Sequence, residues 1–322
     1  MSQLDLFGGP PPPAPFAHPE AVRQLGAGLP QSVHLGCSSW SYPGWAGHVY
    51  AGQPSESVLV SQGLPAYCQH PLLRSVSLDR TLYDPLPAAD LRALAAQVPA
   101  GFRFWVKAHE HTTLARFPDL ARWGERRNQP NARWLDPGYA TDAVVAPVVE
   151  GLGRALGPIL FQFTPDHASE LPPPAFAERL YHFLQGLPKG PTYAVELRDS
   201  RLFLPIYAQA LAHGGAVHCY TVHPAMPPLD IQRLRMPPVN QPALVLRWNL
   251  AHGHTFTTAG RAFGPYNRLQ KPDLPHRQLI AGLCHQAAAR GHEAHIVVSN
   301  HAEGCAPASV VELARVLANE KK

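Results

Sequence analysis

The sequence contains no pair of cysteines at the spacing of a metal-binding or redox motif. Its five cysteines lie at positions 37, 68, 219, 284 and 305, an odd and widely scattered set. This distribution argues against a disulfide framework and against a zinc site built from thiolates. It is typical of proteins in a reducing cytosol, so we expect a cytoplasmic protein.

Long apolar stretches are also missing. No run of about 18 or more apolar residues occurs, so no segment is expected to span a membrane. The first residues lack a basic region followed by an apolar run, so we expect no secretory signal. Neither a Gly-x-Gly-x-x-Gly motif nor a Walker-type loop follows any predicted strand, which weakens a nucleotide-binding open sheet as an alternative.

The composition is that of a folded protein. The chain has 322 residues, of which 45% are hydrophobic and 16% charged, enough for one large domain or two small ones despite 36 prolines. The net charge of +4 and the pI of about 8.8 permit a nucleic-acid partner without requiring one.

Residues 1–31 differ from the rest of the chain. Gly8, Gly9 and the four prolines at 10–13 predict an extended tail rather than a packed core. The glycines make such a tail flexible, and the prolines stiffen part of it. Near its start the segment Gln3, Leu4, Asp5, Leu6 and Phe7 resembles the pentapeptide by which bacterial replication and repair proteins bind the sliding clamp. A chance match at a chain terminus is the alternative.

From residue 32 to 322 strand-like and helix-like segments alternate. This pattern predicts an α/β protein with a single (β/α)8 barrel, and an open doubly wound sheet is the alternative. Strands are expected near 33–38, 73–79, 102–107, 158–163, 192–197, 215–220, 243–248 and 294–299. Helices are expected at 88–98, 141–156, 174–187, 205–213, 275–290 and 307–319.

Polar side chains gather at the carboxyl ends of the predicted strands. Successive strand residues alternate faces, so each apolar set packs on the outer helices and the other set points into the barrel. Active sites of this fold lie at that end. The alternative is a polar network that merely fills the barrel. The inward-pointing set is Asp79, Lys107, Gln162, Glu196, Arg198, Arg247 and Asn300.

Motifs on seven of the eight predicted strands resemble the YecE-like family, domain of unknown function 72. The resemblance begins with Gly-Cys-Ser-Ser-Trp-Ser-Tyr-Pro-Gly-Trp at 36–45. It continues through 76–83, 104–107, 157–162, 194–198, 246–247, 299–301 and 306–307. It implies a TIM barrel with a site at the strand ends but supplies no reaction.

The sequence departs from that family at three places. An acid that usually stands on the second strand is replaced by Ser77. The histidine that usually follows the strand-five arginine is replaced by Asp199. Asn249 and Leu250 follow Trp248 where a His-Gly pair is usual after the strand-seven arginine. These departures predict altered chemistry or a site that has drifted.

Lys107 and Glu196 are the predicted acid–base pair, with a structural ion pair between them as the alternative. Arg198 and Arg247 are suited to bind a phosphate or carboxylate, or to neutralise Glu196 or Asp79. Asp79, Gln162 and Asn300 are expected to contact the substrate. Four aromatic residues are expected either to stack on a sugar or base or to pack over the barrel mouth, namely Trp40, Tyr42, Trp45 and Tyr83.

Histidines near several strand ends allow for a metal site. His109, His111 and His301 are weak candidates for a divalent cation, and no cofactor is predicted. Residues 116–136 form a basic, aromatic, lid-like insertion with five arginines and two tryptophans. That composition suits nucleic acid, although a solvated segment packed by its tryptophans is slightly favoured.

The sequence therefore favours an enzyme that acts on a phosphate-bearing substrate, with nucleic acid among the candidates, and that docks on the sliding clamp through its tail. A catalytically weak, clamp-tethered binding module is the first alternative, supported by the loss of the acid at Ser77. A cytosolic sugar or metabolite hydrolase or isomerase with a chance tail motif is the second.

Overall fold

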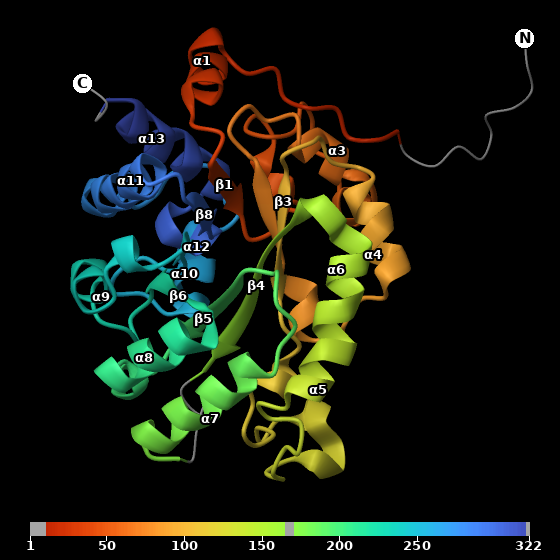
Figure 1. Ribbon diagram of the computed structural model, residues 1–322. Coiled ribbons are helices and arrows are strands. Elements are labelled where there is room, and N and C mark those ends of the chain that lie inside the picture. The colour runs from red at the N-terminus through yellow and green to blue at the C-terminus, as the bar shows by residue number, and fades with distance from the viewer. Residues whose placement is uncertain (1–10, 165–170, 320–322) are drawn as a thin grey trace, which may run out of the picture.

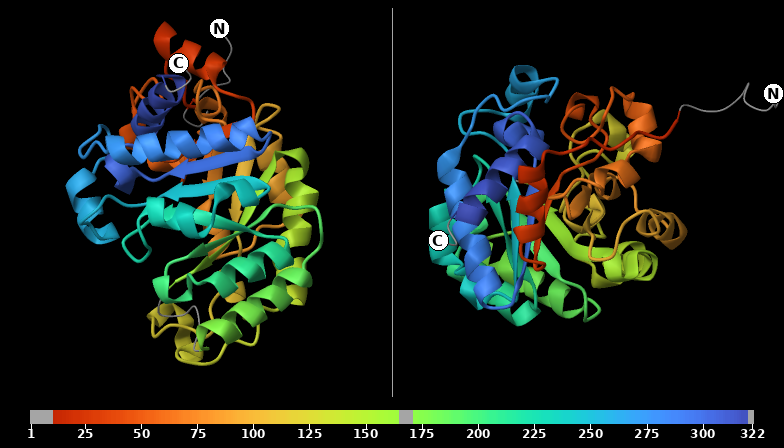
Figure 2. Two further views of the ribbon diagram at one scale, coloured as in Figure 1. Left: turned by 60° about the vertical axis from the view of Figure 1, so that its left-hand side comes forward. Right: turned by 90° about the horizontal axis from the view of Figure 1, so that it is seen from above.

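Eight short parallel strands lie at the centre of the molecule and helices surround them (Figures 1 and 2). This computed structural model describes residues 11–164 and 171–319. The strands are β1 Val33–Cys37, β2 Ser75–Leu78, β3 Arg103–Lys107, β4 Leu156–Phe163, β5 Tyr193–Leu197, β6 Val217–Val222, β7 Ala243–Trp248 and β8 Glu293–Val298. Each strand pairs with the next along the chain, and β8 pairs with β1, so the sheet closes into a barrel.

Helices follow the strands and cover the outside of the barrel. Several begin with a proline in the first turn, where its missing N–H leaves no hydrogen bond unmade. Within the described ranges, no helix combines the length and the apolar character that crossing a membrane requires. The helices are α1 Glu20–Gly28, α2 Glu56–Gln62, α3 Leu64–Tyr67, α4 Ala88–Ala95, α5 Pro137–Ala140, α6 Ala146–Leu152, α7 Pro173–Gln185, α8 Pro205–Gly214, α9 Leu229–Arg235, α10 Phe256–Phe263, α11 Leu274–Ala289, α12 Asn300–Glu303 and α13 Ala306–Asn319.

The closed barrel confirms the predicted (β/α)8 fold and excludes the open sheet, because the first and last strands are paired along five residues of β1. One predicted helix, over 141–156, is shorter than expected. A π-helical turn at Thr141–Val145 leads into α6, and Gly153 ends it with a φ of 50° before β4 begins. Glycine reaches this left-handed backbone region without a Cβ clash.

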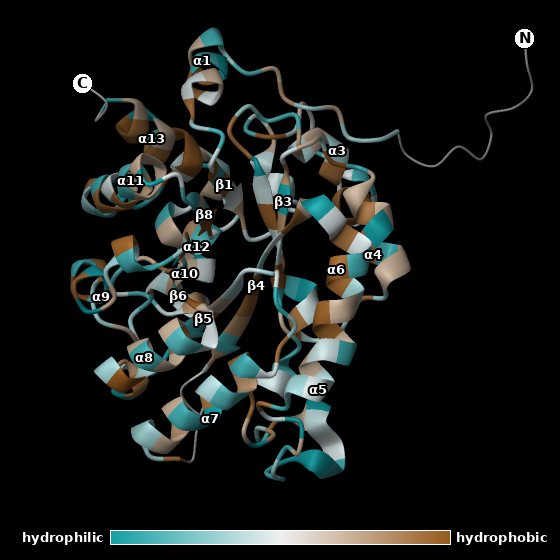
Figure 3. Ribbon diagram, viewed as in Figure 1, coloured by the Kyte–Doolittle hydropathy of each residue, from teal (hydrophilic) through white to brown (hydrophobic). Residues whose placement is uncertain are grey.

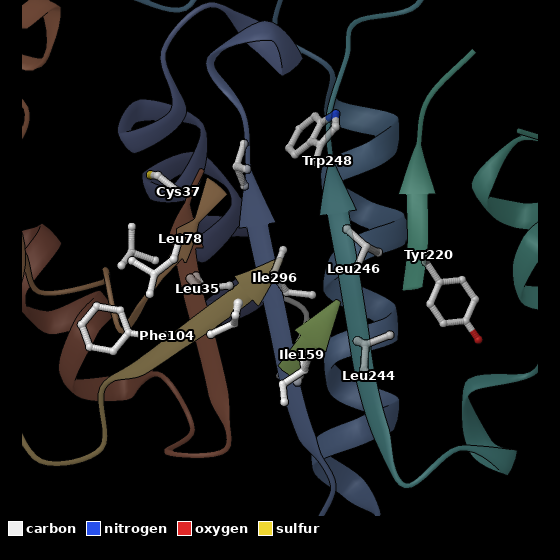
Figure 4. Packing of buried hydrophobic residues seen from close by; sticks show 14 of the residues in the cluster. Leu35, Cys37, Leu78, Phe104, Ile159, Tyr220, Leu244, Leu246, Trp248 and Ile296 are labelled. Carbon is white, nitrogen blue, oxygen red and sulfur yellow. The ribbon is translucent and has the colours of Figure 1, made fainter. Parts of the chain in front are cut away.

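Alternation along the strands builds two separate apolar layers. One set of side chains, including Phe104, Ile159 and Leu246, packs outward against the helices (Figure 4). β4 is largely hydrophobic, whereas the helices mix hydrophilic and hydrophobic residues (Figure 3) because only their inner faces are covered. The second set fills the inside of the barrel and consists of Trp105, Leu160, Ala194, Val217, Cys219, Val245 and Val297.

The prediction of an extended tail over 1–31 is wrong for its second half, where the chain forms the helix α1 and packs against the barrel. The Phe16 N–H donates to the Val49 carbonyl at 2.8 Å, and α1 lies beside α13 (Figure 1). Val22 and Gly26 are buried at the helical spacing of four residues, which explains why this segment folds. The Arg74 guanidinium donates to the Gly26 carbonyl near the end of α1 at 2.8 Å. The clamp-like pentapeptide at 3–7 lies outside the described residues.

Candidate active site

Above the inner apolar layer, polar side chains occupy the carboxyl ends of the strands, a region that we call the mouth. Lys107 ends β3, and the strand register places Gln162 beside Glu196 and Thr221 beside Arg247. Strand alternation puts Trp105, Leu160 and Val245 inside the barrel. The polar residues two positions further along the same strands therefore also point inward.

Glu196 is the centre of a saturated hydrogen-bond network. Its Oε2 accepts from Arg247 Nη1 at 2.6 Å. Its Oε1 accepts from Arg198 Nε at 3.2 Å, Thr221 Oγ1 at 3.2 Å and Asn249 Nδ2 at 3.0 Å. Burial alone would raise the pKa of this carboxyl, but the Arg247 and Arg198 guanidiniums outweigh burial and hold the pKa well below its usual range. Glu196 is therefore ionised at neutral pH.

The predicted Lys107–Glu196 pair is not formed. Glu196 is 0% exposed, so it is screened from any substrate by its own partners. Lys107 Nζ instead lies 2.8 Å from Asp79 Oδ2. Ser77, which stands where the family usually has an acid, donates its hydroxyl to Asp79 Oδ1 at 2.6 Å and so holds that carboxylate in place.

The Lys107–Asp79 pair is open on one side. The side chain of Lys107 is 7% exposed, whereas that of Asp79 is 39% exposed. Burial and the Arg247 charge lower the pKa of Lys107 to about 8, and Asp79 opposes part of that shift. For Asp79, the Lys107 and Arg247 charges outweigh burial and lower the pKa. The pair thus joins an amine that titrates near neutrality to an accessible carboxylate.

Arg198 and Arg247 lie as the sequence predicted, close to Glu196, and both also bind Gln162. The Gln162 Oε1 accepts from Arg198 Nη2 at 3.2 Å and from Arg247 Nη1 at 3.0 Å. The buried Nε of Arg247 has no hydrogen-bond partner among the described residues. Buried charged donors in proteins are normally paired, so this N–H marks a position for a ligand oxygen or a water.

Two of the four predicted stacking residues are core residues instead. Trp45 is fully buried and donates its indole N–H to Asn300 Oδ1 at 3.0 Å, and Trp40 donates to the Leu59 carbonyl at 3.0 Å. The Asn300 Oδ1 also accepts the Ala306 N–H at the start of α13, whereas its buried Nδ2 has no hydrogen-bond partner among the described residues. Strand alternation assigned Asn300 to the inward-pointing set, but the residue lies in α12, beyond the end of β8.

Tyr42 and Tyr83 remain at the rim of the mouth. Tyr42 is half-buried and meets Tyr266 edge-on at 5.5 Å. Burial raises the pKa of Tyr42 to about 12, and Tyr266 and Asp79 add to the effect. Tyr83 is exposed, and the Arg122 guanidinium lies 5.3 Å from its ring.

The three weak metal candidates do not converge. His109 and His111 stack at 4.3 Å just before the insertion, and His109 Nδ1 lies 2.5 Å from the Tyr139 hydroxyl. His301 belongs to another cluster, where its Nε2 lies 3.0 Å from the Tyr266 hydroxyl. Over 11–164 and 171–319, no group of three or more His, Cys, Asp or Glu residues is arranged to hold a metal.

The insertion at 116–136 is packed by its tryptophans. Trp123 is buried with Leu114 and Phe117, and Trp134 joins the main core. Arg122 makes a bidentate pair with Glu110, with both N–O distances at 2.7 Å. The segment is therefore fixed against the barrel next to Tyr83, as the slightly favoured alternative expected.

Sequence reasoning missed Thr221, Phe256 and Tyr266. Thr221 could have been found, because it shares strand parity with Val217 and Cys219 and lies at the end of β6. Phe256 and Tyr266 lie after β7 in a connection without strand periodicity, so no sequence pattern predicts that they lie near the mouth. Asn249, noted only as a departure from the family, binds both Glu196 and Thr221.

Comparison with known proteins bears on the family and the fold. Among curated proteins, none matches the chain. A DUF72 family protein of Enterococcus faecalis has a TM-score of 0.57 at 19% identity, over 89% of this chain and 95% of that one. A DUF72 family protein of Thermotoga maritima has a TM-score of 0.57 at 18% identity, over 89% and 99%. At these identities the likeness concerns the fold.

The family model described as protein of unknown function DUF72 matches residues 34–322, which is almost the whole folded part. This agrees with the YecE-like motifs at the strand ends, several of which contribute the side chains of the mouth. The chain belongs to the DUF72 family.

Proposed function

We propose that the protein is an enzyme that acts on a phosphate-bearing substrate at the mouth of the barrel, with Lys107 as its general acid. The observation that carries the proposal is the Lys107–Asp79 pair, a nearly buried amine with a pKa of about 8 beside an accessible carboxylate. Shifted titratable groups at the carboxyl end of a TIM barrel are typical of catalytic sites.

The charges of the mouth favour an anionic substrate. Three cations, Lys107, Arg198 and Arg247, face two carboxylates, Asp79 and Glu196. The cluster therefore carries a net positive charge in a low-dielectric setting, where attraction for an anion is strong. The planar fork of Arg198, which is mostly but not fully buried, matches the geometry of phosphate oxygens.

The residues divide into three roles. At pH 7 a pKa of about 8 leaves Lys107 protonated by about ten to one, so it is poised to donate a proton to a leaving oxygen. Asp79 orients the ammonium group, and Glu196 acts behind the site by fixing both arginines. Turnover of a panel of phosphate esters by the wild type but not by Lys107→Met is the test of this function.

Recruitment to the sliding clamp is the second part of the proposal, and the match at 3–7 is what supports it. The chain is anchored again at Ala14, whose carbonyl accepts the Ala51 N–H at 3.0 Å. The link from Phe7 to Ala14 covers seven residue steps through 8–13 and spans at most about 25 Å. A clamp bound to the pentapeptide would thus hold the barrel close to DNA, where phosphate esters are abundant.

We expect the purified protein to bind the bacterial sliding clamp with about micromolar affinity, typical of short motifs that fill one pocket. Leu6→Ala with Phe7→Ala should abolish binding, because these side chains would supply the apolar contact. Ser2→Ala, just outside the motif, is the matched control and should bind as the wild type does. Surface plasmon resonance measures all three; equal binding by the double variant would show that the motif is not used.

A further inference from the structure

Aromatic side chains are exposed at only two places among the residues that the structure describes, and both adjoin the mouth. Tyr83 follows β2 and is 60% exposed, and Phe256 begins α10, after β7, and is 39% exposed. All other described Phe, Trp and Tyr residues are buried or half-buried. Exposed aromatic rings beside a cluster of charged side chains are characteristic of surfaces that bind flat ligands.

Phe256 is positioned by its neighbours although it remains 39% exposed. The Thr255 hydroxyl accepts the Thr258 N–H at 3.1 Å, and the Thr258 hydroxyl accepts the Thr255 N–H at 2.8 Å, which fixes the start of α10. His223 and His301 flank the Phe256 ring at centroid distances of 5.7 Å and 5.5 Å. A ring positioned in this way loses little conformational entropy when a ligand stacks on it.

The same ring adjoins the proposed phosphate-binding group. The Arg198 guanidinium lies over the Phe256 ring, 5.6 Å from the ring centre, and it donates to Glu196 and Gln162 inside the mouth. An anion bound at Arg198 would therefore have the remainder of its molecule next to Phe256. A bare phosphate or a small sugar phosphate would leave this ring without a contact.

We propose that the substrate is a nucleotide, with its phosphate at Arg198 and Lys107 and its base stacked on Phe256. This inference rests on the proposed function, because it uses the same anion site. It adds a recognition element, the planar base, that the acid–base pair does not require. Tyr83, which carries Arg122 at 5.3 Å, is the competing position for the base on the other side of the mouth.

The test uses three probes that share a phosphate group: inorganic phosphate, ribose 5-phosphate and adenosine 5′-monophosphate. Binding to the full-length protein is measured by isothermal titration calorimetry. We expect the nucleotide to bind roughly tenfold more tightly than ribose 5-phosphate, as base–aromatic stacking elsewhere implies. Phe256→Ala should remove that difference while changing the affinity for ribose 5-phosphate less than about twofold.

Two further variants keep the test decisive. Phe256→Leu retains apolar volume without an aromatic face and should lose most of the difference, even if the alanine variant folds poorly. Val149→Ala, an exposed apolar position on α6, is the matched control and should bind every probe as the wild type does.

Each contrary outcome has its own meaning. Equal affinity for the nucleotide and for ribose 5-phosphate would overturn the nucleotide inference and leave the proposed function standing. Failure of all three probes to bind would overturn both. A nucleotide preference that survives Phe256→Ala but is lost in Tyr83→Ala would overturn the placement of the base on Phe256.

Discussion

Glu196→Gln is expected to lower the free energy of unfolding by about 3–5 kcal/mol, the cost of breaking a buried ion pair from one side. The variant leaves the Arg247 and Arg198 guanidiniums without their counter-charge, and Arg247 is itself buried. The new amide nitrogen would also face donors in place of an acceptor. Urea denaturation followed by circular dichroism measures the change.

The matched control for this prediction is Glu150→Gln. Glu150 pairs with Arg92 at 2.7 Å, but its side chain is 66% exposed. Exposed pairs contribute about 0–1 kcal/mol, so the control should stay close to the wild type. Equal stability of Glu196→Gln and the wild type would contradict the structural role of Glu196. It would return this carboxylate to the list of reacting groups.

Lys107→Met is expected to lower turnover of the best phosphate-ester substrate by about 100- to 10,000-fold, the usual contribution of a general acid. Methionine fills a similar volume but has no acidic proton to donate. Because Lys107 acts in its protonated form, the wild-type rate should also fall as the pH rises through about 8. Steady-state kinetics from pH 6 to pH 10 measure both effects.

Lys189→Met, at an exposed position before β5, is the control for general effects of losing a lysine, and it should leave the rate unchanged. Full activity of Lys107→Met would remove Lys107 from the chemistry. A rate that rises through pH 8 would instead make the neutral amine the reacting form, so Lys107 would act as a base or nucleophile.

The fold was predictable because it rests on local patterns. Apolar alternation marks the strands, and prolines mark helix starts such as Pro173 and Pro205. Strand parity also identified which polar residues turn inward, including Lys107, Glu196 and Arg247. These patterns depend only on near neighbours in the chain, so they can be recognised without knowing how the strands pair.

The pairing inside the mouth was not predictable by the same means. Parity gives the face of each residue but no distance across the barrel, so Lys107 could be assigned to Glu196 when it contacts Asp79. Trp45 and Asn300 were placed at the ligand because both lie near strand ends. Their hydrogen bond to each other, at 3.0 Å across 255 residues, is a tertiary contact without any local signal.

The titration of Lys107 with and without phosphate shows whether the mouth of the barrel holds an acid–base group that binds anions. The rate at which an amine reagent modifies Lys107, followed by mass spectrometry across pH, reports the pKa of this side chain. We expect a midpoint near 8, a higher midpoint when inorganic phosphate is bound, and a lower one in Asp79→Asn, which removes the charge that stabilises the ammonium form. A midpoint near the ordinary lysine value of about 10.4 that phosphate does not move would contradict an acid–base, anion-binding mouth.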